Sequence, residues 1–352
     1  MHTLTLLVML LLSPLEPPGG GGGKPSPATP MLEKGTELFK QGDTAGALKA
    51  FDAAAKADPA DPRPFYLRGV ALEKKGDPGG AEAAYRKAVG MKSDFAEAQN
   101  NLGALLQAKG NAAEAARAFQ AAVRARPDYP EAQFNLGVAR DAEGNVPQAV
   151  AAYREAVRQK PSDAAYRMNL GAALRKQGDI PGALASMKEA TRLAPKDALM
   201  WTNLGMLQSD AKDYEGAGAS LEKAVKLKDD SALAWDRLGR VALRRKQVDR
   251  AVEAAQRACR LEPKNAAYAA DLCHALIEKR DTVAAVKECK TAVGLDPKNA
   301  LASYELGKAL VAKGDCAAAH KELDRFAAMP AVKPEAKAQA ATIAKSCAPT
   351  KK

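Results

Sequence analysis

The sequence predicts an all-α protein built from repeated helical hairpins that stack into a solenoid. Three observations support this fold class. A glycine recurs every 34 residues, Gly-Asp and Gly-Asn pairs mark tight turns, and the chain is alanine-rich with only 5% aromatic residues. Such a composition favours thin helices that pack closely. We expect about nine hairpins followed by a C-terminal capping helix.

Three positions carry the 34-residue period. The repeat glycine occupies the first of them, and Cys273 replaces it in the eighth repeat. An alanine follows twelve residues later in every repeat, and a large side chain follows sixteen residues later in most, such as Phe51 and Tyr85. A glycine inside a helix costs roughly 1 kcal/mol relative to alanine, so its recurrence predicts that the large side chain packs against it. The repeat glycines are Gly35, Gly69, Gly103, Gly137, Gly171, Gly205, Gly239 and Gly307.

The turn inside each hairpin is also predicted from its residues. In pairs such as Gly42-Asp43 and Gly144-Asn145, the glycine ends the first helix in a left-handed conformation and the Asp or Asn caps the second. Lys212, Lys246 and Arg280 replace this glycine in the sixth to eighth repeats, which are the least regular. Proline closes six of the units, at Pro59, Pro127, Pro161, Pro195, Pro263 and Pro297.

These units resemble tetratricopeptide repeats, whose 34-residue length and leucine-glycine, alanine, aromatic, alanine and proline pattern they share. The resemblance covers residues 31–331 and implies a right-handed superhelix whose first helices line a concave groove. Grooves of this kind receive extended peptides or partner helices. The predicted organisation is an apolar, signal-like segment and a Gly/Pro-rich linker in 1–30, nine repeats in 31–331, and a capping helix with a tail in 332–352.

Candidate binding residues form a ladder of asparagines on four consecutive first helices. Each stands two residues before the repeat glycine, so each is expected to present its amide in the same direction. An amide offers a donor and an acceptor, which match one peptide unit of an extended ligand. This ladder resembles the Asn-lined groove in the repeat domain of O-linked N-acetylglucosamine transferases. The alternative is that the amides bond only to neighbouring repeats. The ladder comprises Asn101, Asn135, Asn169 and Asn203.

A group of arginines continues the ladder. Arg237 occupies the slot that asparagine fills in earlier repeats, and Arg240 and Arg244 follow at helical spacing on the same face. This face is expected to attract an acidic side chain or a terminal carboxylate, with Trp201 and Trp235 nearby. A solvated charged face is the alternative interpretation. We therefore assign the asparagines and arginines together as candidate peptide-binding residues.

The sequence offers little for catalysis, cofactors or nucleic acid. The three histidines, His2, His274 and His320, have no companion at metal-ligand or triad spacing, and we predict neither a metal nor a cofactor. The net charge of +11 raises RNA as a possible partner. Basic residues are spread along most repeats without interleaved stacked aromatics, so nucleic acid is the least favoured partner.

The five cysteines and the N-terminus bear on location. Cys316 and Cys347 are expected to meet, because the capping helix runs back toward the turn of the last hairpin; Cys273 and Cys289 occupy the glycine slot and its partner slot. Both pairs are disulfide candidates, and buried free cysteines are the alternative. The apolar run Leu4–Leu12 has signal-peptide length and is too short to span a bilayer. Export, to a bacterial periplasm, is the favoured location, and the cytoplasm is the alternative.

The functional interpretation is a non-enzymatic scaffold that holds an extended protein or peptide segment, with bacterial envelope assembly or secretion as the expected setting. A second hypothesis is an accessory subunit that presents substrates to a separate transferase, and the asparagine ladder motivates it. An RNA-binding solenoid is the third. The sequence leaves the oligomeric state open.

Overall fold

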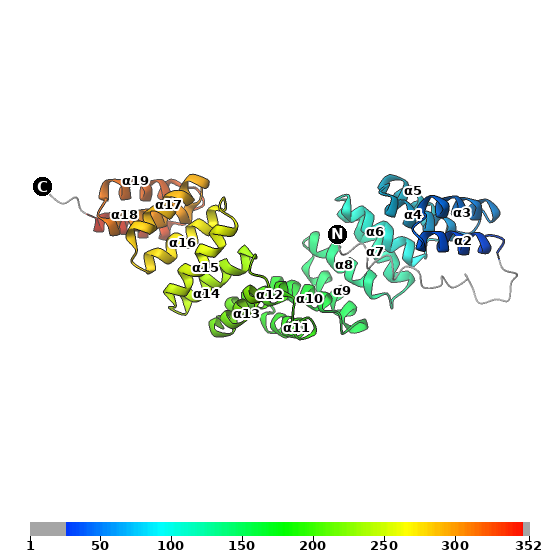
Figure 1. The fold of residues 1–352 in the computed structure, drawn as a ribbon, viewed down its shortest axis with the longest axis horizontal. Helices are drawn as coiled ribbons and strands as arrows, with labels where there is room; N and C mark the ends of the chain where they lie inside the picture. Colours follow the sequence, from blue (N-terminus) through cyan, green and yellow to red (C-terminus); the bar gives the residue numbers. More distant parts are fainter. Residues whose placement is uncertain (1–25, 348–352) are drawn as a thin grey trace. The chain divides into compact units, whose positions relative to one another are not determined.

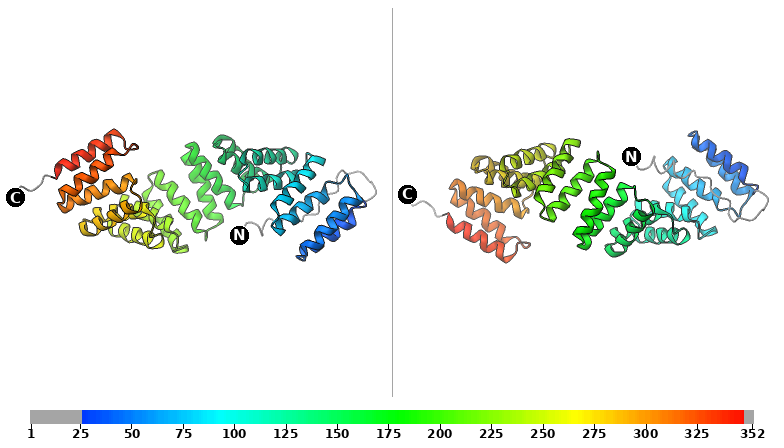
Figure 2. Two further views of the ribbon diagram at one scale, coloured as in Figure 1. Left: turned by 90° about the horizontal axis from the view of Figure 1, so that it is seen from above. Right: turned by 90° about the horizontal axis from the view of Figure 1, so that it is seen from below.

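The structure, a computed structural model, describes residues 26–347. The predicted signal-like segment Leu4–Leu12 lies outside the described residues, as does most of the predicted linker. Every regular element within 26–347 is an α-helix, which confirms the predicted fold class. Helices α2 to α19 pack as nine consecutive hairpins, shown in Figure 1 and from two further directions in Figure 2.

The chain divides into two compact units, and the first ends at Ser162. It holds four hairpins, and its first helix begins at Thr29, two residues before the predicted start of the repeats. The pairs are α2 (Thr29–Lys40) with α3 (Thr44–Ala57), α4 (Arg63–Lys75) with α5 (Pro78–Met91), α6 (Ala96–Ala108) with α7 (Ala112–Ala125), and α8 (Pro130–Ala142) with α9 (Val146–Gln159).

The second unit begins at Asp163 and holds five hairpins and a final single helix. Its hairpins are α10 (Ala164–Gln177) with α11 (Ile180–Leu193), α12 (Ala198–Asp210) with α13 (Tyr214–Leu227), α14 (Ala232–Arg244) with α15 (Val248–Leu261), α16 (Ala266–Glu278) with α17 (Thr282–Leu295), and α18 (Ala300–Lys313) with α19 (Cys316–Ala328). The single helix is α20 (Pro334–Ser346).

The turns inside the hairpins have the predicted geometry. Gly42, Gly76 and Gly144 have φ values between 76° and 89°, in the left-handed region that glycine enters without steric cost. Asp43 then accepts a hydrogen bond from the backbone amide of Gly46, which caps the second helix. Lys212, Lys246 and Arg280 take the same left-handed conformation, with φ values of 62°, 58° and 64°. The irregular sixth to eighth repeats therefore keep the same turn.

The repeat glycines are packed against the large side chains predicted for them. A Cβ atom on Gly69 would lie 2.5 Å from a ring carbon of Tyr85, and one on Gly103 would lie 2.7 Å from Phe119. These approaches are far shorter than van der Waals contact, so only glycine allows the two helices of a hairpin to come so close. In the fifth hairpin Met187 replaces the ring and leaves more room, 3.3 Å from the corresponding position on Gly171.

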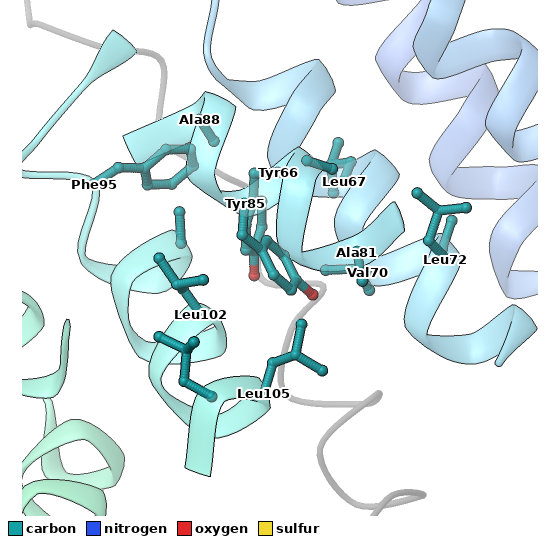
Figure 3. Close-up of a cluster of buried hydrophobic side chains, with 14 of the residues drawn as sticks. Tyr66, Leu67, Val70, Leu72, Ala81, Tyr85, Ala88, Phe95, Leu102 and Leu105 are labelled. Carbon is teal, nitrogen blue, oxygen red and sulfur yellow. The ribbon is translucent and has the colours of Figure 1, made fainter. Parts of the chain in front are cut away.

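The core of each unit lies between hairpins as well as within them. Tyr66 of α4 packs its ring 6.0 Å from that of Tyr85 in α5 and 5.0 Å from that of Phe95, which precedes α6 (Figure 3). All three side chains are buried. A single hairpin cannot bury such rings by itself, so each repeat depends on its neighbour for a complete core.

Helix α20 is the predicted capping helix. It contacts α18 and α19, and Ala340 and Ala344 are buried against Leu323 and Phe326 of the last hairpin. The far side of α20 is polar and exposed, as expected for a helix that ends a repeat array.

Candidate functional site

The candidate site is a stripe along each first helix, which we call the inner stripe. It consists of the residues six and two positions before the repeat glycine and one and five positions after it. These residues lie on one helical face, because their spacings are four, three and four. On α12 the inner stripe is Leu199, Asn203, Met206 and Asp210, and on α14 it is Leu233, Arg237, Arg240 and Arg244.

Asn101 and Asn135 of the ladder lie in the first unit, and both are engaged within it. The side-chain amide of Asn135 donates to Oδ1 of Asn100 at 2.9 Å, and Asn100 donates to Oδ1 of Asn101 at 3.3 Å. Asn101 is only 3% exposed. Its side-chain nitrogen is buried without a hydrogen-bond partner in the described chain, so the amide is not presented to a ligand, contrary to expectation. Asn135 remains half-buried.

Asn169 and Asn203 lie in the second unit and are half-buried. Asn169 donates to the carbonyl oxygen of Ala165 in its own helix at 2.9 Å, which leaves its side-chain oxygen as the free acceptor. Asn203 has no hydrogen-bond partner among residues 26–347. Three of the four predicted rungs, Asn135, Asn169 and Asn203, are therefore partly exposed. Asn203 is the one of these whose side-chain donor and acceptor both lack a partner in the described chain.

The predicted arginines share the inner stripe of α14 but differ in their partners. Arg240 donates to Oδ2 of Asp271 on α16 at 2.6 Å, and its Nε lies 3.3 Å from Oδ2 of Asp236. Arg237 reaches Asp236 only at 3.8 Å. Arg244 is exposed and has no ion pair within the described part of the chain. The cations available to a ligand are therefore Arg237 and Arg244, and Arg240 joins two hairpins.

Asp236 was not predicted as a site residue. Its Oδ2 is the carboxylate oxygen near both Arg237 and Arg240. Asp236 is 2% exposed, and neither carboxylate oxygen has a hydrogen-bond partner in the range that the structure covers. Burial and the nearby Asp271 raise the pKa of Asp236 to about 7, against the opposing effect of Arg240 and Arg237. The sequence signal for this residue was its place beside Arg237, on a helix whose other buried positions are apolar.

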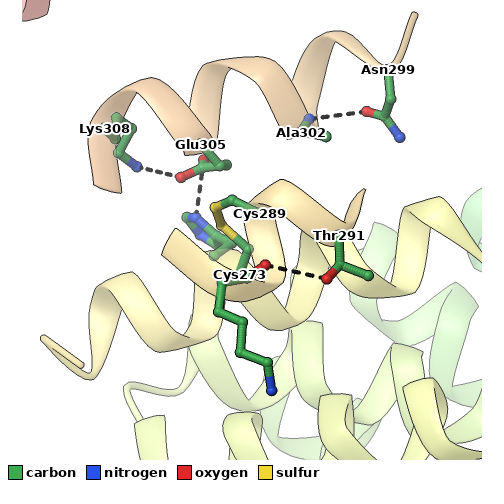
Figure 4. Close-up of a disulfide and its surroundings, with 9 residues drawn as sticks. Cys273, Cys289, Thr291, Asn299, Ala302, Glu305 and Lys308 are labelled. Carbon is green, nitrogen blue, oxygen red and sulfur yellow. Dashed lines mark hydrogen bonds and ion pairs between the residues drawn. A yellow bond between two sulfur atoms is a disulfide. The ribbon is translucent and has the colours of Figure 1, made fainter. Parts of the chain in front are cut away.

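His274, which had no partner in the sequence, finds one on the next first helix. Its Nδ1 lies 3.1 Å from Oε1 of buried Glu305, and Nζ of Lys308 lies 2.9 Å from Oε2 of the same carboxylate (Figure 4). The hydrogen bond that His274 makes to the Glu305 carboxylate raises the pKa of His274. Asp271 and Glu305 occupy the ladder slot of the eighth and ninth repeats, so this slot becomes charged beyond Asn203.

The two tryptophans near the site support the fold instead of facing a ligand freely. Nε1 of Trp201 donates to the carbonyl oxygen of Pro195 at 3.0 Å, and Nε1 of Trp235 donates to that of Asp229 at 2.8 Å. Lys223 covers the ring of Trp201, with Nζ 3.9 Å from its centroid, and Arg250 lies over Trp235. Both indoles therefore hold the turn between neighbouring hairpins.

The four predicted cysteines lie close together in the predicted pairs. The Cα atoms of Cys316 and Cys347 are 5.3 Å apart, within the range for disulfides. Those of Cys273 and Cys289, which Figure 4 shows, are 5.2 Å apart. Cys259 is left over, at a cavity of about 770 Å³ between α15, α16 and α17. Burial raises the pKa of its thiol to about 12, so it stays protonated.

Within residues 26–347 the side chains form no group of three or more His, Cys, Asp or Glu suited to a metal ion. Among the helices in that range, none combines the length and apolar character needed to cross a membrane. The inner stripes carry the side-chain amides of Asn135, Asn169 and Asn203 and the ion pairs of Arg240 and His274.

Stacked hairpins with a polar inner stripe define a helical repeat scaffold. Six overlapping matches to the tetratricopeptide repeat family model, at residues 32–101, 100–164, 139–198, 168–232, 202–266 and 237–300, identify the kind of repeat. The chain belongs to the tetratricopeptide repeat family. Members of this family are generally non-catalytic scaffolds for protein–protein interaction. A search of curated proteins found no match.

Solved structures agree with this assignment. YrrB, described as a TPR protein with an unusual peptide-binding site, aligns with a TM-score of 0.50 at 25% identity, over 53% of this chain and 96% of its own. The Cut9–Hcn1 hetero-tetramer of APC/C aligns with a TM-score of 0.54 at 20% identity, over 80% of this chain and 55% of its own. PilF of Pseudomonas aeruginosa aligns with a TM-score of 0.52 at 19% identity, over 59% and 94%. The last two are similar in fold.

Proposed function

We propose that this protein holds an extended segment of a partner protein along the inner stripes of its first helices. The observation that carries the proposal is the slot two residues before the repeat glycine in the second unit, where Asn169 and Asn203 keep accessible side-chain groups; Asn135 fills the same slot in the first unit. Each net hydrogen bond to a ligand backbone contributes about 0.5–1.5 kcal/mol, so the rungs together supply moderate affinity with little sequence preference. The peptide-binding site described for YrrB supports this use of the fold.

The proposed setting is the envelope or a secretion pathway of a bacterium. Two cysteine pairs at disulfide distance favour an oxidising compartment, because such bridges persist there and are rare in the cytosol. A substrate-presenting subunit of a separate transferase is the second candidate function, and the same accessible amides favour it.

Partner capture tests the proposal. The full-length protein is immobilised on a resin and incubated with an extract of its native host. It should retain a partner protein, which mass spectrometry then identifies. Replacing the two accessible rungs of the second unit, Asn169→Ala and Asn203→Ala, should weaken this capture because each replacement removes a hydrogen bond to the ligand backbone. Gln256→Ala, which removes an exposed amide from the second helix α15, is the matched control.

Circular dichroism and thermal melting should be nearly unchanged in both variants, since neither side chain contributes to the buried core. Capture that is unaffected by the double substitution would mean that the amides are structural. Recovery of a transferase as the main retained protein would favour the second candidate.

A further inference from the structure

Exposed leucines recur on the inner stripes of the second unit. Leu199 is 52% exposed, Leu233 is 37% exposed and Leu301 is 44% exposed. All three stand six residues before the repeat glycine, so they are spaced in register with the repeat, and Ala267 takes this slot in the eighth hairpin. Single exposed leucines are ordinary on protein surfaces, but leucines that repeat in register on adjacent helices form an apolar row.

The apolar row runs beside the polar slot already described. Leu199 and Asn203 lie one helical turn apart on α12, and Leu233 and Arg237 lie one turn apart on α14. Asn203 is without a hydrogen-bond partner within the described chain. Two adjacent helices thus each offer one apolar contact and one open polar group.

Charge on the inner stripe changes sign from helix to helix. The inner stripe of α14 consists of Leu233 and three arginines, and it is therefore positively charged; Arg237 and Arg244 are available to a ligand. On α16 the same positions hold Asp271, His274 and exposed Glu278. A ligand carboxylate is therefore attracted at α14 and repelled at α16, which gives the surface a direction.

The helix spacing sets the spacing of the ligand's side chains. Helices that pack side by side have axes about 8–10 Å apart, and α12 and α14 contact each other. A polyproline II chain has three residues per turn and rises about 3.1 Å per residue, so side chains three residues apart share a face at about 9 Å. Two apolar side chains at this separation reach Leu199 and Leu233 together.

We propose that the inner stripes of α12 and α14 bind an extended acidic segment with two apolar side chains three residues apart, the second followed closely by a carboxylate that pairs with Arg237. The apolar side chains rest on Leu199 and Leu233, and Asn203 bonds the ligand backbone between them. This inference rests on the proposed function and names the sequence class of the partner segment.

Binding of synthetic peptides to the full-length protein tests the inference. The probe is a fluorescently labelled ten-residue peptide with leucines three residues apart and a glutamate after the second. One comparison peptide has the glutamate replaced by lysine, and another has the same composition with the leucines adjacent. We expect the probe to bind about tenfold more tightly than either, which corresponds to the loss of one good contact.

Protein variants locate the contact. Leu233→Ala and Arg237→Gln should each weaken the probe about tenfold, because each truncates one of the proposed contacts. The matched controls are Leu227→Ala, an exposed leucine on the second helix α13, and Arg260→Gln, an exposed arginine on α15. These controls should bind the probe as the unsubstituted protein does, and all four variants should keep their helix content.

The outcomes separate this inference from the proposed function. Equal binding of all three peptides, combined with loss on Asn203→Ala, would overturn the inference and leave the proposed function standing. Absence of binding to any peptide would overturn the inference, while native partner capture remains an independent test of the function. Concentration-dependent self-association that Leu233→Ala abolishes would also overturn it, by assigning the apolar row to a second copy of the chain.

Discussion

At the residue scale, the repeat glycines show how a single missing atom fixes the fold. On Gly69 a Cβ atom would lie 2.5 Å from Tyr85, whose ring is fully buried and held by Tyr66. The ring cannot withdraw without disturbing the next hairpin. On Gly171 a Cβ atom would lie 3.2 Å from the backbone oxygen of Ala183 and 3.3 Å from the flexible methyl group of Met187, so the crowding is much smaller.

Gly69→Ala should therefore destabilise the protein by about 1–3 kcal/mol through overpacking, despite the higher helix propensity of alanine. Gly171→Ala is the matched comparison and should cost much less. Urea unfolding of both variants measures the difference. Equal effects of the two substitutions would argue that the close ring contact does not determine the spacing of the helices.

Asp236 provides a pH-dependent test at the same scale. Its pKa is raised from 3.8 to about 7 in the folded chain, so between these values the folded protein holds a proton that the unfolded chain has released. The free energy of unfolding must then fall as pH rises through this window. Asp236→Asn cannot titrate, and we expect its stability relative to the unsubstituted protein to increase from pH 5 to pH 8.

Urea titrations at several pH values check this expectation. The control is Asp230→Asn, which alters a carboxylate exposed at the turn between hairpins. Its profile should run parallel to that of the unsubstituted protein. If the Asp236→Asn profile is also parallel, the buried carboxyl does not titrate in the stated window.

At the element scale, the local signals in the sequence were sufficient to predict the hairpins. Glycine spacing, Asp or Asn caps and closing prolines each act within one repeat, so they were readable without knowing the fold. The left-handed turns at Lys212 and Lys246 show that the turn is kept even where glycine is missing, closed by backbone hydrogen bonds within the hairpin. The predicted capping helix agrees for the same reason, since α20 follows the last apolar face.

The candidate site was only partly predictable, because its contacts join different first helices. Asn101 shares its slot with Asn203, but its neighbours close over it and bury it. The ion pairs Arg240–Asp271 and His274–Glu305 connect residues 31 positions apart, a distance at which sequence spacing shows no local pattern. Only packing between repeats decides which of these side chains are open to a ligand.

The cysteine pairs give a further prediction at the element scale. If both pairs are oxidised, the unfolded, unreduced protein should have one free thiol, since four of its five cysteines are consumed. Three free thiols would indicate a single bridge, as expected if only Cys316 and Cys347 are joined. The titration needs the unfolded chain because Cys259 is protonated and half-buried in the native state.

A bridge between Cys316 and Cys347 ties α20 to the start of α19. Reduction of this bridge should lower stability by about 2–4 kcal/mol for a loop of this kind, and in Cys347→Ala only the smaller loss from reducing Cys273–Cys289 should remain. Thermal melting with and without reductant measures it. Five free thiols in protein from the native host would contradict the bridge and remove its support for an oxidising compartment.

At the scale of the whole molecule, charge decides between classes of partner. The chain carries 53 Lys and Arg residues against 42 Asp and Glu residues, and the difference gives the net charge of +11. Many of the cations are held in ion pairs, as Arg250 is with Glu222 at 2.7 Å. Cations that are already paired release fewer counterions from a nucleic acid, so their contribution to its binding is small.

We therefore expect no shift of single-stranded or double-stranded RNA by the full-length protein at an ionic strength near 0.15 M, although weak binding at low salt would be consistent with the net charge. Electrophoretic mobility measured across a salt series tests this. Capture of a protein partner should be less sensitive to salt, because amide hydrogen bonds and contacts to the apolar row contribute most of the free energy of binding. RNA binding that persists at 0.15 M and weakens with further salt would instead make nucleic acid a partner, and the inner stripes would then need to be reconsidered as its binding surface.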